Sequence, residues 1–204
     1  MMFINSKKPR KFSEEVEKSS GTSPFRSKLL KNETDELQLN LPSTCSIKFD
    51  NPDQLSNFDL IICPDEGHWQ KGRFRFSINV PYDYNMAPPI VKCHTRIWHP
   101  NIGENGDVCL GSLRVNRRLD FGWFPSLRLM HVVWDVNSLF THFSSFDDSL
   151  NGEAAGQYWR DRDGFSAKVK NYVELYAKMR PIKKAKRVDS VMRAIELNKL
   201  CRDE

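Results

Sequence analysis

Residues 73–80 constrain the fold most strongly, because apolar and polar side chains alternate there without a break. The apolar members are Phe74, Phe76, Ile78 and Val80. Alternation with a period of two predicts a strand with one buried face and one face in water. Apolar runs at 47–49, 60–62 and 90–93 predict three further strands, and turn residues at 64–67 separate the second from the third. We therefore expect an antiparallel meander of four strands.

Helical patterns flank this meander. Apolar side chains recur at helical spacing over residues 24–41, and Pro42 ends that pattern. Residues 127–143 are apolar nearly all round, which predicts a buried central helix. A short helix begins at 151–155, and an apolar stripe over 165–176 predicts the last helix of the core. Strands followed by helices indicate the α+β class.

The charge is unevenly distributed along the 204 residues, which carry a net charge of +5. Residues 1–18 hold five basic and three acidic groups, and residues 180–204 hold eight basic and four acidic groups. The 18 basic and 19 acidic groups between them leave the body near neutral. This balance argues against a nucleic-acid-binding core and assigns electrostatic partner contacts to the two ends.

Three regions follow from these patterns. We expect a flexible, polar docking extension over 1–22, a folded core over 23–180 and a basic extension over 181–204. No run approaches the roughly 20 apolar residues of a membrane span, and the first residues lack the apolar core of a signal peptide. The expected location is the cytoplasm and the nucleus, with no membrane partner.

The five cysteines fit a reducing compartment, since they form no CxxC pair and no disulfide-like spacing. A zinc site is an alternative interpretation, because Cys93, His94, His99 and Cys109 lie close in sequence and carry the ligand types that zinc prefers. Adjacent Cys93 and His94 point to opposite faces of a strand, so we expect no bound metal.

The segment Trp98-His99-Pro100-Asn101, followed by Val108-Cys109-Leu110, carries the most chemistry. Cys109 offers a thiol nucleophile, and the turn can bring the Asn101 amide near it. Gly103 and Gly106 allow the intervening loop to fold tightly. A fixed amide donor beside a thiol suits acyl transfer, because the tetrahedral intermediate develops an oxyanion that needs such a donor.

This motif resembles the active-site signature of the ubiquitin-conjugating enzyme family. The resemblance covers about residues 25–179 and includes Tyr84 with Pro88-Pro89, Trp123 with Pro125, and the acidic pair Asp147-Asp148. Within the family, the chain most resembles the animal neddylation-conjugating enzymes of the F type, in part because the segment between Cys109 and Trp123 is long. The implied fold is an N-terminal helix, a four-stranded antiparallel meander, the cysteine loop, and central and C-terminal helices.

The resemblance implies that Cys109 accepts a ubiquitin-like modifier from an activating enzyme as a thioester and transfers it to a substrate lysine. It assigns Asp148 to orienting or desolvating that lysine. No cofactor is implied, since the activating enzyme consumes the ATP. The implied further partners are a RING-type ligase and a cullin.

Each site residue also has a structural interpretation. Asn101 is either the oxyanion donor or a residue that pins its own turn, and both roles can coexist. His99, with Pro100, is expected to brace the loop rather than to act as a base. Asp148 matches the acidic position of the family, but an acidic pair before a helix is also a common capping feature.

Partner surfaces are also implied by the resemblance. Met86, Pro125 and Ser126 match the two loops that bind RING-type ligases, although such residues also cap cores. The first four residues, Met1, Met2, Phe3 and Ile4, match a tail that docks on the activating enzyme. A solvated tail without a partner would have the same composition.

Two departures from the family pattern stand out. Ser149 replaces the proline that usually follows the acidic pair, and residues 181–204 have no counterpart in the pattern. Three other functions are compatible with parts of the sequence: conjugation of ubiquitin instead of its relative, an inactive binding scaffold, and nucleic-acid binding through the basic tails. Cys109 and Asn101 argue against the scaffold.

Overall fold

The computed structural model describes residues 24–115, 122–141 and 149–178. The first helix, α2 (Pro24–Leu39), precedes four strands: β1 (Cys45–Lys48), β2 (Asn57–Ile62), β3 (Phe74–Asn79) and β4 (Ile90–Cys93). A 3₁₀ turn, η1 (Gly111–Leu113), follows the cysteine. The remaining helices are α3 (Leu129–Thr141), α4 (Gly152–Arg160), α5 (Arg162–Tyr172) and the π-helical turn η2 (Val173–Ala177).

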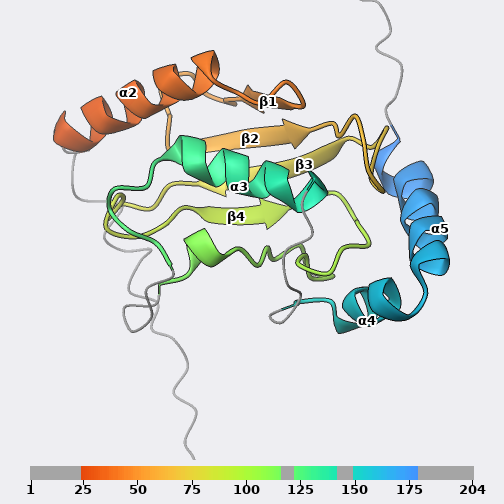
Figure 1. The fold of residues 1–204 in the computed structure, drawn as a ribbon. Coiled ribbons are helices and arrows are strands. Elements are labelled where there is room, and N and C mark those ends of the chain that lie inside the picture. Colours follow the sequence, from red (N-terminus) through yellow and green to blue (C-terminus); the bar gives the residue numbers. More distant parts are fainter. Residues whose placement is uncertain (1–23, 116–121, 142–148, 179–204) are drawn as a thin grey trace, which may run out of the picture.

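The four strands form one antiparallel sheet in sequence order, β1-β2-β3-β4, as the alternation predicts. The register pairs Leu60 with Phe76 and Ile78 with Val91, so apolar side chains of neighbouring strands share one face. Helix α3 lies across that face (Figure 1). Phe140 of α3 packs on Phe74 with ring centroids 4.9 Å apart. The core therefore lies between α3 and the sheet.

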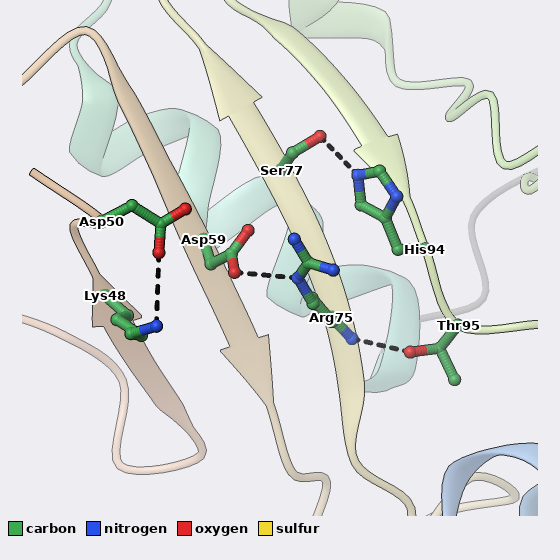
Figure 2. Close-up of polar contacts among 7 residues, drawn as sticks. All are labelled: Lys48, Asp50, Asp59, Arg75, Ser77, His94 and Thr95. Atoms are coloured by element: carbon green, nitrogen blue, oxygen red, sulfur yellow. Dashed lines mark hydrogen bonds and ion pairs between the residues drawn. The ribbon is translucent and has the colours of Figure 1, made fainter.

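The opposite face of the sheet is polar, as expected for a half-buried meander. Figure 2 shows this face with α3 behind the strands. Arg75 Nε donates to Asp59 Oδ2 at 2.8 Å, and His94 Nε2 lies 2.7 Å from Ser77 Oγ. Cross-strand polar pairs of this kind keep the exposed face in water while the apolar side chains fill the core.

The central helix differs from its prediction. Its buried residues form one stripe that includes Val132, Val133 and Val136, but Trp134 is 51% exposed. A helix that lies on a single layer of sheet buries one face only, so even an apolar helix leaves a side chain such as Trp134 in solvent.

The last two helices meet at Asp161. Its side chain accepts from the Gly164 N–H at 2.9 Å and caps α5, while its backbone N–H closes α4 on the Gln157 carbonyl. Of the predicted apolar stripe, Phe165, Val169 and Val173 are buried, whereas Tyr176 is exposed. The cap lets α5 start in a new direction and pack its apolar stripe at the end of the sheet (Figure 1).

No helix among residues 24–115, 122–141 and 149–178 is long and apolar enough to cross a membrane.

Candidate functional site

Cys109 is half-buried at the end of a tight loop that starts from β4. The Cys93 N–H donates to the Gly106 carbonyl at 2.8 Å, and the Gly103 N–H donates to the Asp107 carbonyl at 2.9 Å. Gly106 has a φ of 86°, and a side chain there would collide with the Cys93 carbonyl. The glycine therefore allows the loop to turn against β4 and return the chain to the cysteine.

The Trp98–Asn101 turn is joined directly to the cysteine. The Cys109 N–H donates to the Asn101 carbonyl at 2.8 Å, and Ile102 forms an isolated bridge with Val108. Asn101 and Cys109 are thus neighbours across a short antiparallel pairing. The sequence-based expectation that the loop brings these two residues together is met by this geometry.

His99 lies beneath this turn with both ring nitrogens engaged. Its Nε2 lies 2.9 Å from the Leu139 carbonyl in α3, and its Nδ1 accepts from the Asn101 N–H at 2.9 Å. The ring packs on Trp69 with centroids 4.6 Å apart. Burial lowers the pKa of His99 to about 4, so the ring is neutral and Nε2 carries the hydrogen. Neither nitrogen is left to serve the thiol as a base.

The side-chain amide of Asn101 has no hydrogen-bond partner among the described residues, whereas its backbone N–H and carbonyl are both bonded. The turn is held by His99 and by the Cys109 N–H rather than by this amide. An amide donor that is partly exposed, bonded to none of the described residues and next to a thiol is available to an oxyanion that develops there.

Arg114 is a site residue that sequence reasoning missed. Its Nη2 donates to Cys109 Sγ at 3.0 Å. The 3₁₀ turn Gly111–Leu113 reverses the chain after the cysteine, and the Arg114 N–H closes it on the Gly111 carbonyl at 3.1 Å. The glycine two residues after Cys109 was the available signal for this turn. The contact places positive charge beside the Cys109 sulfur.

A shallow cavity of about 260 Å³ lies beside the thiol, and Cys109, Arg114 and Leu150 line it. The segment with Leu150 is held in place because the Asn151 N–H donates to the Pro100 carbonyl at 2.9 Å. The Asn151 side chain then caps α4 through the Ala154 N–H. Pro100 therefore joins the turn to the segment that follows the acidic pair.

Several predicted residues lie outside the described ranges. Asp148 falls in 142–148, and Met1, Met2, Phe3 and Ile4 fall in 1–23. Ser149, the residue that departs from the family pattern, is half-buried and directly precedes Leu150 of the cavity.

The loop residues expected to meet a ligase are all at the surface. Met86 is 64% exposed, and Pro125 and Ser126 are exposed on a second loop. Asn85 connects the two loops, since its Nδ2 donates to the Pro125 carbonyl at 2.7 Å. Residues far apart in sequence thus form one surface region.

The zinc alternative finds no support in the part of the chain that the structure describes, where no three His, Cys, Asp or Glu side chains are grouped to hold a metal. Cys93 is buried with its thiol donating to the Thr95 carbonyl, while His94 is on the polar face of the sheet (Figure 2). The opposite orientation of these neighbours continues the alternation of β4, which ends at Cys93.

Residues 29–173 match the family model described as "Ubiquitin-conjugating enzyme". The match spans most of the chain, and the fold has the meander, cysteine loop and helices described above. The chain belongs to the ubiquitin-conjugating enzyme family, whose members are transferases that act through a thioester intermediate. Enzymes of this family need no cofactor of their own, because ATP is used by the activating enzyme.

Particular relatives narrow the class. The chain is 51% identical over 153 residues to NEDD8-conjugating enzyme UBE2F of Gallus gallus, covering 75% of this chain and 83% of the relative. It is 50% identical over 153 residues to the Homo sapiens protein of the same name, with the same two coverages. A solved structure of S. cerevisiae Ubc12 superposes with a TM-score of 0.63 at 30% identity, covering 76% of this chain and 82% of that one.

Proposed function

We propose that this chain is a neddylation-conjugating enzyme that carries a NEDD8-type modifier as a thioester on Cys109 and transfers it to lysines. The observation that carries the proposal is the half-buried Cys109 hydrogen-bonded to the turn that presents the Asn101 amide, an amide with no hydrogen-bond partner among the described residues. The identity to relatives named NEDD8-conjugating enzyme supports the choice of modifier.

In the loading step, the Cys109 thiolate attacks the thioester between the modifier and the activating enzyme. The carbonyl oxygen becomes an oxyanion, and collapse of the intermediate expels the thiolate of the activating enzyme. The Asn101 amide donates to that oxyanion; removal of such a donor costs on the order of a hundredfold or more in rate. His99 and Pro100 hold the turn that positions the amide.

In the transfer step, a substrate lysine attacks the thioester on Cys109 and the Cys109 thiolate departs. A lysine of pKa about 10.4 is almost wholly protonated at neutral pH and must lose a proton to become an amide nitrogen. We assign Asp148 to orienting this lysine. Leu150, two residues further on, lines the cavity beside the thiol, which supports that assignment.

The acceptor is proposed to be a cullin lysine presented by a RING-type ligase. Met86, Pro125 and Ser126 are the proposed ligase contacts, and their shared exposure supports this role. Residues 1–22, beginning with Met1, Met2, Phe3 and Ile4, are proposed to dock on the activating enzyme. The proposed location is the cytoplasm and the nucleus, and no membrane or nucleic-acid partner is proposed.

The test of the main proposal is thioester loading. The chain is incubated with the neddylation activating enzyme, NEDD8 and ATP, and separately with ubiquitin and its own activating enzyme. We expect a reductant-sensitive NEDD8 adduct that Cys109→Ala abolishes and that Cys63→Ala, a change at another half-buried cysteine, leaves intact. Absence of the NEDD8 adduct, or an adduct with ubiquitin only, would contradict the proposal.

The role of Asn101 is tested with Asn101→Ala. Transfer to lysine should slow about a hundredfold. The melting temperature should remain close to that of the wild type, since the side chain bonds to none of the described residues. A large fall in melting temperature with unchanged transfer would instead assign this amide to holding the turn.

A further inference from the structure

Two surface loops of this enzyme are tied together by Asn85. Its side-chain Nδ2 donates to the Pro125 carbonyl at 2.7 Å, and its own carbonyl accepts from Trp123 Nε1 at 2.7 Å. The two bonds run in opposite directions between the same loops, residues 82–87 and 123–127. One residue therefore both donates to the second loop and accepts from it.

The tie is anchored in the core. The ring of Tyr84 packs on Trp123 with centroids 5.8 Å apart, and the Tyr84 hydroxyl donates to Glu33 of α2. The same Glu33 carboxylate accepts from the Leu129 N–H, at the first residue of α3, at 2.9 Å. Burial raises the pKa of Tyr84, so its hydroxyl remains a donor. Both loops are thus positioned relative to α2 and α3.

Exposed apolar side chains stand on the two tied loops. Met86 follows Asn85 directly, and Phe124, 49% exposed, lies between Trp123 and Pro125. A partner that contacts both loops would otherwise have to order them on binding, and ordering of loops weakens affinity. Loops that are already joined avoid that loss.

We propose that Asn85 is the positioning residue that holds these loops as one preformed docking surface for a RING-type ligase. This inference rests on the proposed ligase role of Met86, Pro125 and Ser126. The chemistry requires an amide here, because the bond to Pro125 needs a donor. Aspartate has the same shape as asparagine but only accepts, so it would face the Pro125 carbonyl with negative charge.

The experiment compares the wild type, Asn85→Ala and Asn85→Asp in transfer of NEDD8 from the loaded enzyme to a cullin C-terminal domain bound to its RING protein. The concentration of the cullin–RING complex is varied. We expect its half-saturating value to rise about five- to tenfold in both variants, in line with the loss of one hydrogen bond. Loading by the activating enzyme and unassisted discharge to free lysine should match the wild type.

Controls separate this effect from general loss of structure. Asn40→Ala removes a like bond, from a side-chain amide to the Glu36 carbonyl at 2.8 Å, at the C-terminal end of α2, and should leave the half-saturating value unchanged. Trp123→Phe removes the second bond and keeps a ring. When Trp123→Phe and Asn85→Ala are combined, the half-saturating value should rise by less than the two separate effects predict, because both bonds hold the same two loops.

Several outcomes would overturn the inference. An unchanged half-saturating value in Asn85→Ala, or wild-type behaviour in Asn85→Asp, would refute the role of the donor. Hydrogen exchange tests the tie without any ligase, since amides of residues 82–87 and 123–127 should exchange faster in Asn85→Ala; unchanged exchange would refute it as well. If the RING complex fails to accelerate even the wild type, the ligase role proposed above is wrong, and the docking claim falls with it.

Discussion

Acidification tests the part that buried His99 plays in stability. The ring is 1% exposed, and its two nitrogens bond the Leu139 carbonyl and the Asn101 N–H. Protonation of Nδ1 would replace the acceptor for the Asn101 N–H with a second donor, and it would charge a group that water does not reach. This is why burial lowers the pKa of His99 to about 4.

The size of the effect follows from proton linkage. In the unfolded chain, a histidine titrates near pH 6.5, whereas in the folded protein His99 titrates near 4. Between these values the unfolded state holds a proton that the folded state lacks, so stability falls as the pH falls. The neutral, buried His99 ring therefore contributes about 3 kcal/mol to the free energy of unfolding; this contribution is complete above pH 6.5 and is lost below pH 4.

The assay is urea unfolding of the wild type and His99→Asn at pH steps from 8 to 4. At pH 7 the variant should be less stable by about 3 kcal/mol, since it loses the bond to Leu139 and the ring contact with Trp69. The difference in unfolding free energy between the two proteins cancels the effects of groups that they share, such as His68. It should shrink toward zero near pH 4. Two parallel curves would refute the reasoning.

Three further predictions concern single sites. Gly106→Ala should destabilise the protein by more than about 1 kcal/mol in urea unfolding, because φ at Gly106 is 86° and a Cβ would meet the Cys93 carbonyl. The control Gly111→Ala adds a Cβ that meets no atom within 4 Å and should not destabilise the protein. Equal effects of the two variants would contradict this prediction. Asp161→Ala should cost about 1 kcal/mol by removing the cap of α5, and an unchanged unfolding free energy would count against the cap. Burial raises the pKa of Cys45 and of Cys93 to about 11. Iodoacetamide at pH 7.5 should therefore modify the native protein at Cys109 and not at Cys45 or Cys93, as measured by peptide mass spectrometry. Rapid labelling of Cys93 would refute its burial.

Much of the fold was predictable because its signals are local. The alternation at 73–80 requires a strand whatever surrounds it, and β3 with its neighbours in sequence order confirms the meander. The central helix was predicted as an element but not in its exposure. Trp134 is apolar, and only the presence of a single sheet layer on one side of α3 leaves it in solvent.

The candidate site divides in the same way. Cys109 and the His-Pro-Asn turn were found from residue types and spacing, since a thiol near an amide indicates acyl transfer in any context. The bond between His99 and the Leu139 carbonyl was not predictable, because Leu139 lies 40 residues away along the chain. The contact of Arg114 with Cys109 depends on a short turn whose direction the residue types alone do not determine.

The sequence by itself determined the order of elements, the polar face of the sheet, the candidate nucleophile and the family resemblance, because periodicity and motif spacing are properties of neighbouring residues. Tertiary structure decided that the His99 ring is neutral and fully bonded, that the Asn101 amide bonds to none of the described residues, and that Asn85 joins two loops. These features depend on burial and on hydrogen bonds between distant segments, which arise only when the chain has packed.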